Sequence, residues 1–143
     1  MHLYWRFSRG LTLGVRGMAI GDDGRIFLVK HSYVPGWHLP GGGVEVRETM
    51  REALDRELRE EGNIEILQTP VLFGIYHNRE PSGRDHVALF VTRAFAQTAQ
   101  PQPNAEIIDH GFFAPDALPP DTTAGTRKRI AEVAEGGKPA EYW

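Results

Sequence analysis

Residues 41–64 read GGGVEVRETMREALDRELREEGNI. This stretch joins three consecutive glycines to a segment in which Glu57, Glu60 and Glu61 stand three and four residues apart. On an α-helix these side chains share one face, where like charges cost roughly 0.2–0.5 kcal/mol per pair. A hard divalent cation would turn that repulsion into attraction. The cluster therefore indicates either a magnesium site or a solvated acidic face paired with nearby arginines.

The same stretch predicts where its helix begins and what it packs against. Thr49 and Glu52 form the Thr-x-x-Glu pattern of a capping box, which makes Met50 the first helical residue. Met50, Leu54 and Leu58 recur every four residues and form an apolar stripe that can dock on a sheet. The glycines before the helix allow backbone conformations that side chains would block.

The spacing within residues 42–64 is more specific than the acidic clustering. Glu48 follows the second glycine after five residues, and an Arg-Glu-Leu triplet, a Glu-Glu pair and an isoleucine follow at fixed separations. Six residue types of ordinary usage match such a pattern by chance about once in 10⁷ positions. The pattern resembles the Nudix box, the signature of hydrolases that act on nucleoside diphosphates linked to another moiety. It departs from the family at Asn63, where glycine is usual, but asparagine also tolerates the left-handed conformation that ends a helix.

The resemblance implies a role for each residue of the box. The implied metal ligands are Glu57, Glu60, Glu61 and the carbonyl of Gly41. The bound ion would be Mg²⁺, with Mn²⁺ as a possible substitute, and Glu48 and Arg56 would form an ion pair that orients the site. The family does not use one position uniformly for the base that accepts a proton from water. The candidates for this catalytic role are Glu57, Glu60 and, outside the box, Glu106.

Substrate selection is expected to come from residues near the rim of the site. A base or sugar can stack on a tyrosine, an arginine can grip a phosphate, and an acid beside the glycines can reach a metal through water. Taken singly, each such residue is better explained by core packing or by plain surface exposure. The candidates are His31, Tyr33, Glu45, Tyr76, His77, Arg79 and Arg84.

Composition agrees with a small enzyme. The 143 residues are expected to form one domain, 1–143, that is long enough to bury a real core. The chain has no cysteine, which excludes disulfides and thiolate metal sites. No apolar run reaches the length of a membrane span and no signal peptide is visible, so a cytoplasmic location is expected. The net charge of −3 argues against general nucleic-acid binding. The resemblance implies a nucleotide-derived small molecule as the partner. Aromatic residues within 1–10 leave a homodimer contact open.

Apolar and β-branched runs bounded by turn residues predict a mixed sheet with helices on its faces. The segment Ile64–His77 reads as one strand or as two strands broken near Pro70. The other predicted strands are Leu11–Ile20, Arg25–Lys30, Trp37–Leu39, His86–Phe95 and Ile107–Phe113. A short turn of helix is predicted over Pro115–Leu118 and a last helix over Thr123–Glu135. The fold class is therefore α/β (α+β, with a mixed sheet), and the resemblance implies a Nudix-type α/β/α sandwich.

The expected activity is Mg²⁺-dependent hydrolysis of the diphosphate linkage in a nucleoside diphosphate derivative, through attack of water on phosphorus. The alternative is an inactive Nudix-fold domain that senses nucleotides, although such domains typically lose box glutamates that this chain retains. Diphosphate isomerisation on the same scaffold depends on a cysteine, which is absent here. The sequence does not choose among nucleoside diphosphate sugars, ADP-ribose, dinucleoside polyphosphates, damaged nucleoside triphosphates and capped RNA ends.

Overall fold

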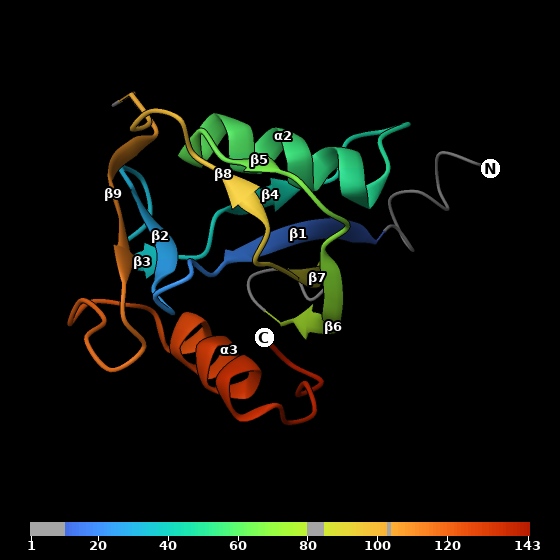
Figure 1. The fold of residues 1–143 in the computed structure, drawn as a ribbon. Coiled ribbons are helices and arrows are strands. Elements are labelled where there is room, and N and C mark those ends of the chain that lie inside the picture. The colour runs from blue at the N-terminus through green and yellow to red at the C-terminus, as the bar shows by residue number, and fades with distance from the viewer. Residues whose placement is uncertain (1–10, 80–84, 103) are drawn as a thin grey trace.

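The computed structural model describes residues 11–79, 85–102 and 104–143 (Figure 1). The predicted roles of Arg84 and of the aromatic residues within 1–10 lie outside the described residues. Neither of the two helices in the described part of the chain is long and apolar enough to cross a membrane.

The largest sheet places β1 (Thr12–Ala19) between two other strands. β4 (Gly41–Gly43) pairs with β1 in the antiparallel direction and forms one edge of the sheet. β7 (Asp85–Thr92) pairs with β1 in parallel, and β6 (Val71–Asn78) pairs with β7 in the antiparallel direction. The sheet is therefore mixed, as the sequence predicts.

A second sheet and a short strand pair complete the β-structure. β2 (Ile26–His31) lies between β3 (Trp37–His38) and β9 (Ile107–Phe113), and both pairings are antiparallel. β5 (Glu65–Ile66) pairs with β8 (Phe95–Ala96) beside the upper helix in Figure 1.

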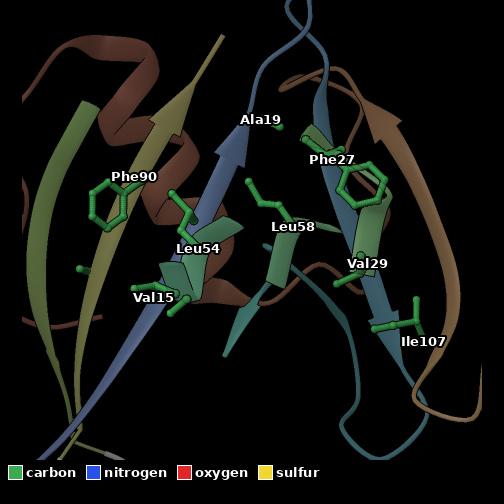
Figure 2. Packing of buried hydrophobic residues seen from close by; sticks show 11 residues of the cluster. Val15, Ala19, Phe27, Val29, Leu54, Leu58, Phe90 and Ile107 are labelled. Carbon is green, nitrogen blue, oxygen red and sulfur yellow. The ribbon is translucent and has the colours of Figure 1, made fainter. Parts of the chain in front are cut away.

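Alternation along the strands divides the interior into two hydrophobic cores. On β1, Val15 and Ala19 face α2 (Met50–Gly62), where they pack with Leu54 and Leu58. Figure 2 shows Leu54 beside Val15, and Leu58 between β1 and the Phe27 and Val29 side chains of β2. The intervening residues of the same strands, Met18 and Leu28 among them, join the other core, which includes Ile130 of α3 (Ala124–Glu135). One helix therefore covers each face of the β-layer, which confirms the predicted sandwich (Figure 1).

A glycine lets α2 approach the sheet closely. A Cβ placed on Gly17 of β1 would lie 3.0 Å from Cδ1 of Leu54 and 3.0 Å from Cδ2 of Leu58. Any side chain at this position would therefore press on the helix that carries the glutamates.

The predicted ends of both helices are confirmed. Thr49 caps α2, its hydroxyl accepts a hydrogen bond from the Glu52 N–H, and Glu52 completes the capping box. Asn63 ends α2 in the left-handed region at φ 52°, which is the conformation that its place in the pattern requires. Thr123 caps α3, which ends at Gly136.

Two predicted elements differ from the structure. Pro115–Leu118 forms a turn closed by a 2.9 Å hydrogen bond from the Ala117 N–H to the Ala114 carbonyl, and not a turn of helix. The two prolines at 119 and 120 offer no N–H donor and disfavour helical geometry just before them, so a helix cannot develop. The predicted strand His86–Phe95 is divided, because Phe95 leaves the large sheet to pair with Ile66. Pro70 separates β5 from β6, so the two-strand reading of Ile64–His77 is correct.

Candidate active site

A cleft of about 700 Å³ opens beside the C-terminal half of α2. It lies between the glycines of β4, the end of β2 and the segment that leads into β9. Most of the predicted site residues line it together: Glu57, Glu60, Glu61, Gly41, Arg56, Glu106, His31 and Tyr33.

Glu61 is the most deeply buried carboxylate of the cleft. Its Oε1 accepts a 2.8 Å hydrogen bond from the Gly41 N–H, whereas its buried Oε2 has no hydrogen-bond partner among the described residues. Burial, strengthened by the nearby charge of Glu57, raises the pKa of Glu61 to about 8, although the Gly41 N–H opposes the shift. An ionised carboxylate at this position is therefore costly unless a cation joins it.

His31 lies next to this carboxylate without neutralising it. Its Nε2 is 3.5 Å from the free Oε2 of Glu61, and its Nδ1 is buried without a partner. Burial and the charge of Arg16 lower the pKa of His31 to about 4, so the imidazole is neutral at pH 7. The contact is consequently not a salt bridge at neutral pH.

Arg56 fixes the orientation of Glu57. Its Nε and Nη2 donate to the two carboxylate oxygens of Glu48 at 2.8 and 2.9 Å, and its Nη1 donates to Oε1 of Glu57 at 2.8 Å. Nη2 also donates to the Gly43 carbonyl at 3.1 Å. The Arg56 hydrogen bonds lower the pKa of Glu48 to about 2 and keep it ionised. These contacts place Glu48 and Arg56 where the predicted orienting pair belongs.

Glycine at position 42 leaves room for the Glu57 carboxylate. A Cβ at Gly42 would lie 2.5 Å from Oε1 of Glu57, so the carboxylate occupies the space that a side chain would fill. The Glu57 carboxylate therefore packs directly against the backbone of β4.

The two remaining carboxylates are more open. The side chain of Glu60 is 59% exposed, with Oε2 3.8 Å from Nη1 of Arg56. Glu106 precedes β9 and is fixed through its backbone, because its N–H donates to Oδ1 of Asn104 and its carbonyl accepts from the Ser32 N–H, both at 2.8 Å. The Glu106 carboxylate makes no hydrogen bond or ion pair with the described residues, which leaves it available to a ligand or water in the cleft.

Several predicted substrate residues lie elsewhere. Tyr76 is buried beneath α3 and donates a 2.8 Å hydrogen bond to Glu132. The ring of His77 packs against His86 at a centroid distance of 5.0 Å, away from the cleft lining. The side chain of Glu45 is exposed, and its Oε1 lies 3.9 Å from Nη2 of Arg56. Arg79 stacks on Tyr142, with Cζ 3.9 Å from the ring centroid.

The sequence prediction missed Arg16, which lies directly behind the glycines. Arg16 is partly buried on β1, and its Nη1 donates to the Leu39 carbonyl at 2.7 Å. A single arginine in an otherwise apolar strand belongs to no motif. The sequence did offer one signal for it: a charged residue within the strand Leu11–Ile20, which the alternation of apolar residues assigns to the sheet interior.

The described carboxylates and imidazoles do not converge into a cluster of three or more that would enclose a metal ion by themselves. Mg²⁺ usually retains waters and takes further oxygens from substrate phosphates, so one or two protein carboxylates facing a cleft suit it. The free Oε2 of Glu61 and the nearby Glu57 meet that requirement.

Comparisons with known proteins agree with this geometry. The family model described as NUDIX domain matches residues 10–133. A MutT-like protein of Streptomyces ambofaciens is 27% identical over 128 residues, which cover 90% of this chain and 80% of that protein. A Bacillus subtilis protein with the provisional name 8-oxo-dGTP diphosphatase is 34% identical over 127 residues, which cover 89% and 83% respectively.

A solved structure of a Nudix hydrolase also matches the fold of this chain. The crystal structure of a MutT NUDIX hydrolase from Burkholderia pseudomallei superposes with a TM-score of 0.73 at 27% identity. The match covers 85% of this chain and 97% of that chain. The family match spans most of the sequence and includes the whole 42–64 pattern. The chain belongs to the Nudix family of hydrolases.

Proposed function

We propose that the protein is a Mg²⁺-dependent hydrolase that cleaves the diphosphate linkage of a nucleoside diphosphate derivative. The observation that carries the proposal is the free, buried Oε2 of Glu61, which lies beside Glu57 in a cleft wide enough for a phosphate chain. A buried carboxylate oxygen without a hydrogen-bond donor is stabilised by a cation, which favours a metal-binding role for Glu61.

Glu57, Glu60 and Glu61 would hold the metal, with the Gly41 carbonyl as a further oxygen ligand. When bound, Mg²⁺ supplies charge neutralisation on the phosphate oxygens and lowers the pKa of water, and Mn²⁺ can supply the same chemistry. Arg56 holds Glu57 in place through the 2.8 Å bond to its Oε1 while Glu48 fixes the guanidinium.

Glu106 is the favoured general base, because it lines the cleft and its carboxylate has no partner among the described residues. In this role it accepts the proton of the water whose oxygen attacks phosphorus, while the bridging P–O bond breaks and its electrons leave with the departing phosphate. Glu57 and Glu60 are the other candidates. Glu57 is the weaker of these two, since Arg56 already occupies its Oε1.

His31 and Tyr33, which also line the cleft, offer a surface for the rest of the substrate. Tyr33 is 69% exposed and packs against His31 with a centroid distance of 5.2 Å. An exposed tyrosine supported by a buried imidazole presents a flat face on which a base or sugar can stack. His31 and Tyr33 are therefore the substrate-binding residues that we retain, in preference to Tyr76 and His77.

The test is a product assay by mass spectrometry. Purified protein is incubated with nucleoside triphosphates, nucleoside diphosphate sugars, ADP-ribose and dinucleoside polyphosphates, with Mg²⁺, with Mn²⁺ and with neither. We expect metal-dependent cleavage of one class into a nucleoside monophosphate and a phosphorylated product. Metal-dependent binding of these compounds without turnover of any of them would instead support the alternative, a nucleotide-sensing domain.

Matched variants test the residue assignment. Glu60→Gln and Glu61→Gln should each lower kcat by about 10²-fold or more, because each removes a metal-facing charge without changing side-chain size. Glu65→Gln, at an exposed position of β5, is the control and should leave kcat unchanged. Near-normal activity of both site variants would contradict the assignment of the metal ligands.

A further inference from the structure

The backbone of β4 separates opposite charges. On one side, a Cβ at Gly42 would lie 2.5 Å from the Glu57 carboxylate. On the other side, a Cβ at Gly41 would lie 2.8 Å from Cδ of Arg16. Because neither glycine carries a side chain, only peptide backbone stands between the arginine and the carboxylates. β4 is also an edge strand, so a ligand can pass around it.

A second, smaller cleft begins where the first one ends. It has a volume of about 210 Å³, shares Gly42 with the carboxylate cleft and has Arg16 in its lining. Asp85 lies four strand residues away along β1, where it pairs with Thr12 and accepts a hydrogen bond from its hydroxyl. That spacing corresponds to about 13 Å, so the cationic end of this cleft is the end next to Gly42.

Arg16 makes few direct polar contacts with the described residues, although the charges of Glu61 and Glu57 act on it. Its one hydrogen bond is to the Leu39 carbonyl, and no carboxylate oxygen of the described residues lies within 4.0 Å of it. A guanidinium carries five N–H donors, so most of them are left for other partners. The buried side-chain atoms without a partner in the described chain are His31 Nδ1 and Glu61 Oε2. The unused donors of Arg16 are not among these atoms, so they are accessible to solvent.

The other cation of the active site is already committed. Arg56 donates to Glu48, Glu57 and the Gly43 carbonyl, which leaves it little capacity for a ligand. Of the two described arginines that line these clefts, Arg16 therefore keeps free donors for a group that continues from a diphosphate held at the α2 carboxylates. The group that continues from the diphosphate across Gly42 must be anionic to suit it, since a neutral sugar would leave the guanidinium unmatched.

We propose that Arg16 binds a third phosphate of the substrate, across the Gly42 backbone from the two phosphates held at the α2 carboxylates. The inference rests on the proposed function and narrows it, because it makes the substrate a nucleoside triphosphate or another polyphosphate. Arg16 is then a specificity-determining residue that discriminates such substrates from nucleoside diphosphate sugars.

The test measures binding separately from catalysis. Inorganic tripolyphosphate and pyrophosphate are each titrated calorimetrically, in the presence of Mg²⁺, into the wild type and into Arg16→Gln. We expect the wild type to prefer tripolyphosphate, and the variant to lose tripolyphosphate affinity by about 10- to 100-fold while pyrophosphate affinity stays the same. Arg16→Lys keeps the charge without the planar fork and should retain part of the preference.

Arg93→Gln is the matched control, because Arg93 is exposed and lines neither cleft. It removes the same charge and should change neither affinity. Should Arg16→Gln fail to fold, Arg16→Lys carries the test, with an intermediate tripolyphosphate preference as the expected result.

Three results would overturn the inference. They are a wild type that binds both anions equally, an Arg16→Gln variant that keeps the preference, and a variant that loses affinity for both anions alike. The last result would mean that Arg16 acts only by holding the loop at Leu39. Tripolyphosphate preference without cleavage of any nucleotide would uphold the role of Arg16 and refute the hydrolase function. Cleavage of a nucleotide, together with an Arg16→Gln variant that keeps the tripolyphosphate preference, would uphold the hydrolase function and refute the role of Arg16.

Discussion

At the scale of single residues, Arg47 in the loop before α2 adopts a backbone conformation that costs free energy. Arg47 has φ 69°, in the left-handed region that costs a residue with a side chain about 1–2 kcal/mol. Arg47→Gly should remove this cost but increase the entropy of the unfolded chain, for a net gain of up to about 1 kcal/mol in the free energy of unfolding. Urea denaturation measures the difference. A loss of stability would show that the Arg47 side chain makes a contact worth more than the strain.

Asn63 provides the comparison for that experiment. It also lies in the left-handed region, but its side chain donates a 3.0 Å hydrogen bond to the Ala99 carbonyl. Asn63→Gly exchanges that bond for an easier backbone conformation, so we expect a change within about 0.5 kcal/mol. The two substitutions together separate backbone strain from side-chain bonding.

Glu48 links the orienting ion pair to acid stability. Its pKa is about 2 in the folded protein against an ordinary value of 4.5, because Arg56 holds the ionised form. A carboxyl group whose pKa is lowered on folding adds stability above the unfolded value and loses it as the pH falls through the folded value. The stability gap between the wild type and Glu48→Gln should therefore narrow between pH 4.5 and pH 2 in urea titrations. A gap that stays constant across this range would mean that the pair does not favour the ionised carboxylate.

At the scale of elements, the fit between β1 and α2 sets the position of the glutamates. A methyl group at Gly17 would lie 3.0 Å from Leu54 and from Leu58, and Leu58 stands between the proposed metal ligands Glu57 and Glu60 of the same helix. Gly17→Ala should cost about 1–3 kcal/mol and lower kcat, because α2 must shift. Gly137→Ala, where a Cβ meets nothing within 4 Å, is the control and should change neither quantity. An unchanged kcat in Gly17→Ala would show that the core yields without moving the helix.

The elements that the sequence predicts well are those determined by neighbours in the chain. The capping box at Thr49, the exit at Asn63 and the break at Pro70 are local, and each is found where its residues indicate. Contacts between distant segments are less predictable. Tyr76 is a residue type suited to substrate binding. Its side chain nevertheless lies on the face of β6 that packs against α3, where it contacts Glu132. Arg16 contacts Leu39 because β1 pairs with β4, which brings two distant segments together.

At the scale of the whole molecule, a buried arginine joins α3 to the end of the chain. Arg129 is 1% exposed, donates to both carboxylate oxygens of Glu132 at 2.9 and 3.0 Å, and reaches the Tyr142 carbonyl at 3.2 Å. Its Cζ also lies 4.4 Å from the centroid of the Tyr76 ring and 5.2 Å from that of Trp143. This group ties the final residues to β6 and α3, on the face of the sheet opposite α2.

Removing the arginine should therefore affect stability and not catalysis. Arg129→Ala leaves Glu132 without its main partner, and we expect a loss of about 3–5 kcal/mol in the free energy of unfolding. Lys128→Ala, at the exposed neighbouring position, should cost less than about 0.5 kcal/mol. The Mg²⁺ dependence of the folded Arg129 variant should match that of the wild type, since the two cores lie on opposite faces. A shifted Mg²⁺ dependence would reveal coupling between the faces.

The glycine strand is fastened to α2 at both ends, by Glu61 at Gly41 and by Arg56 at Gly43. The loop that follows is held close to the cleft, while Val46 within it remains 86% exposed. Because the chain contains no cysteine, Val46→Cys would create a single thiol in the loop that follows the glycine strand. A fluorophore attached there should report nucleotide binding in real time, without replacing any of the proposed metal or phosphate ligands.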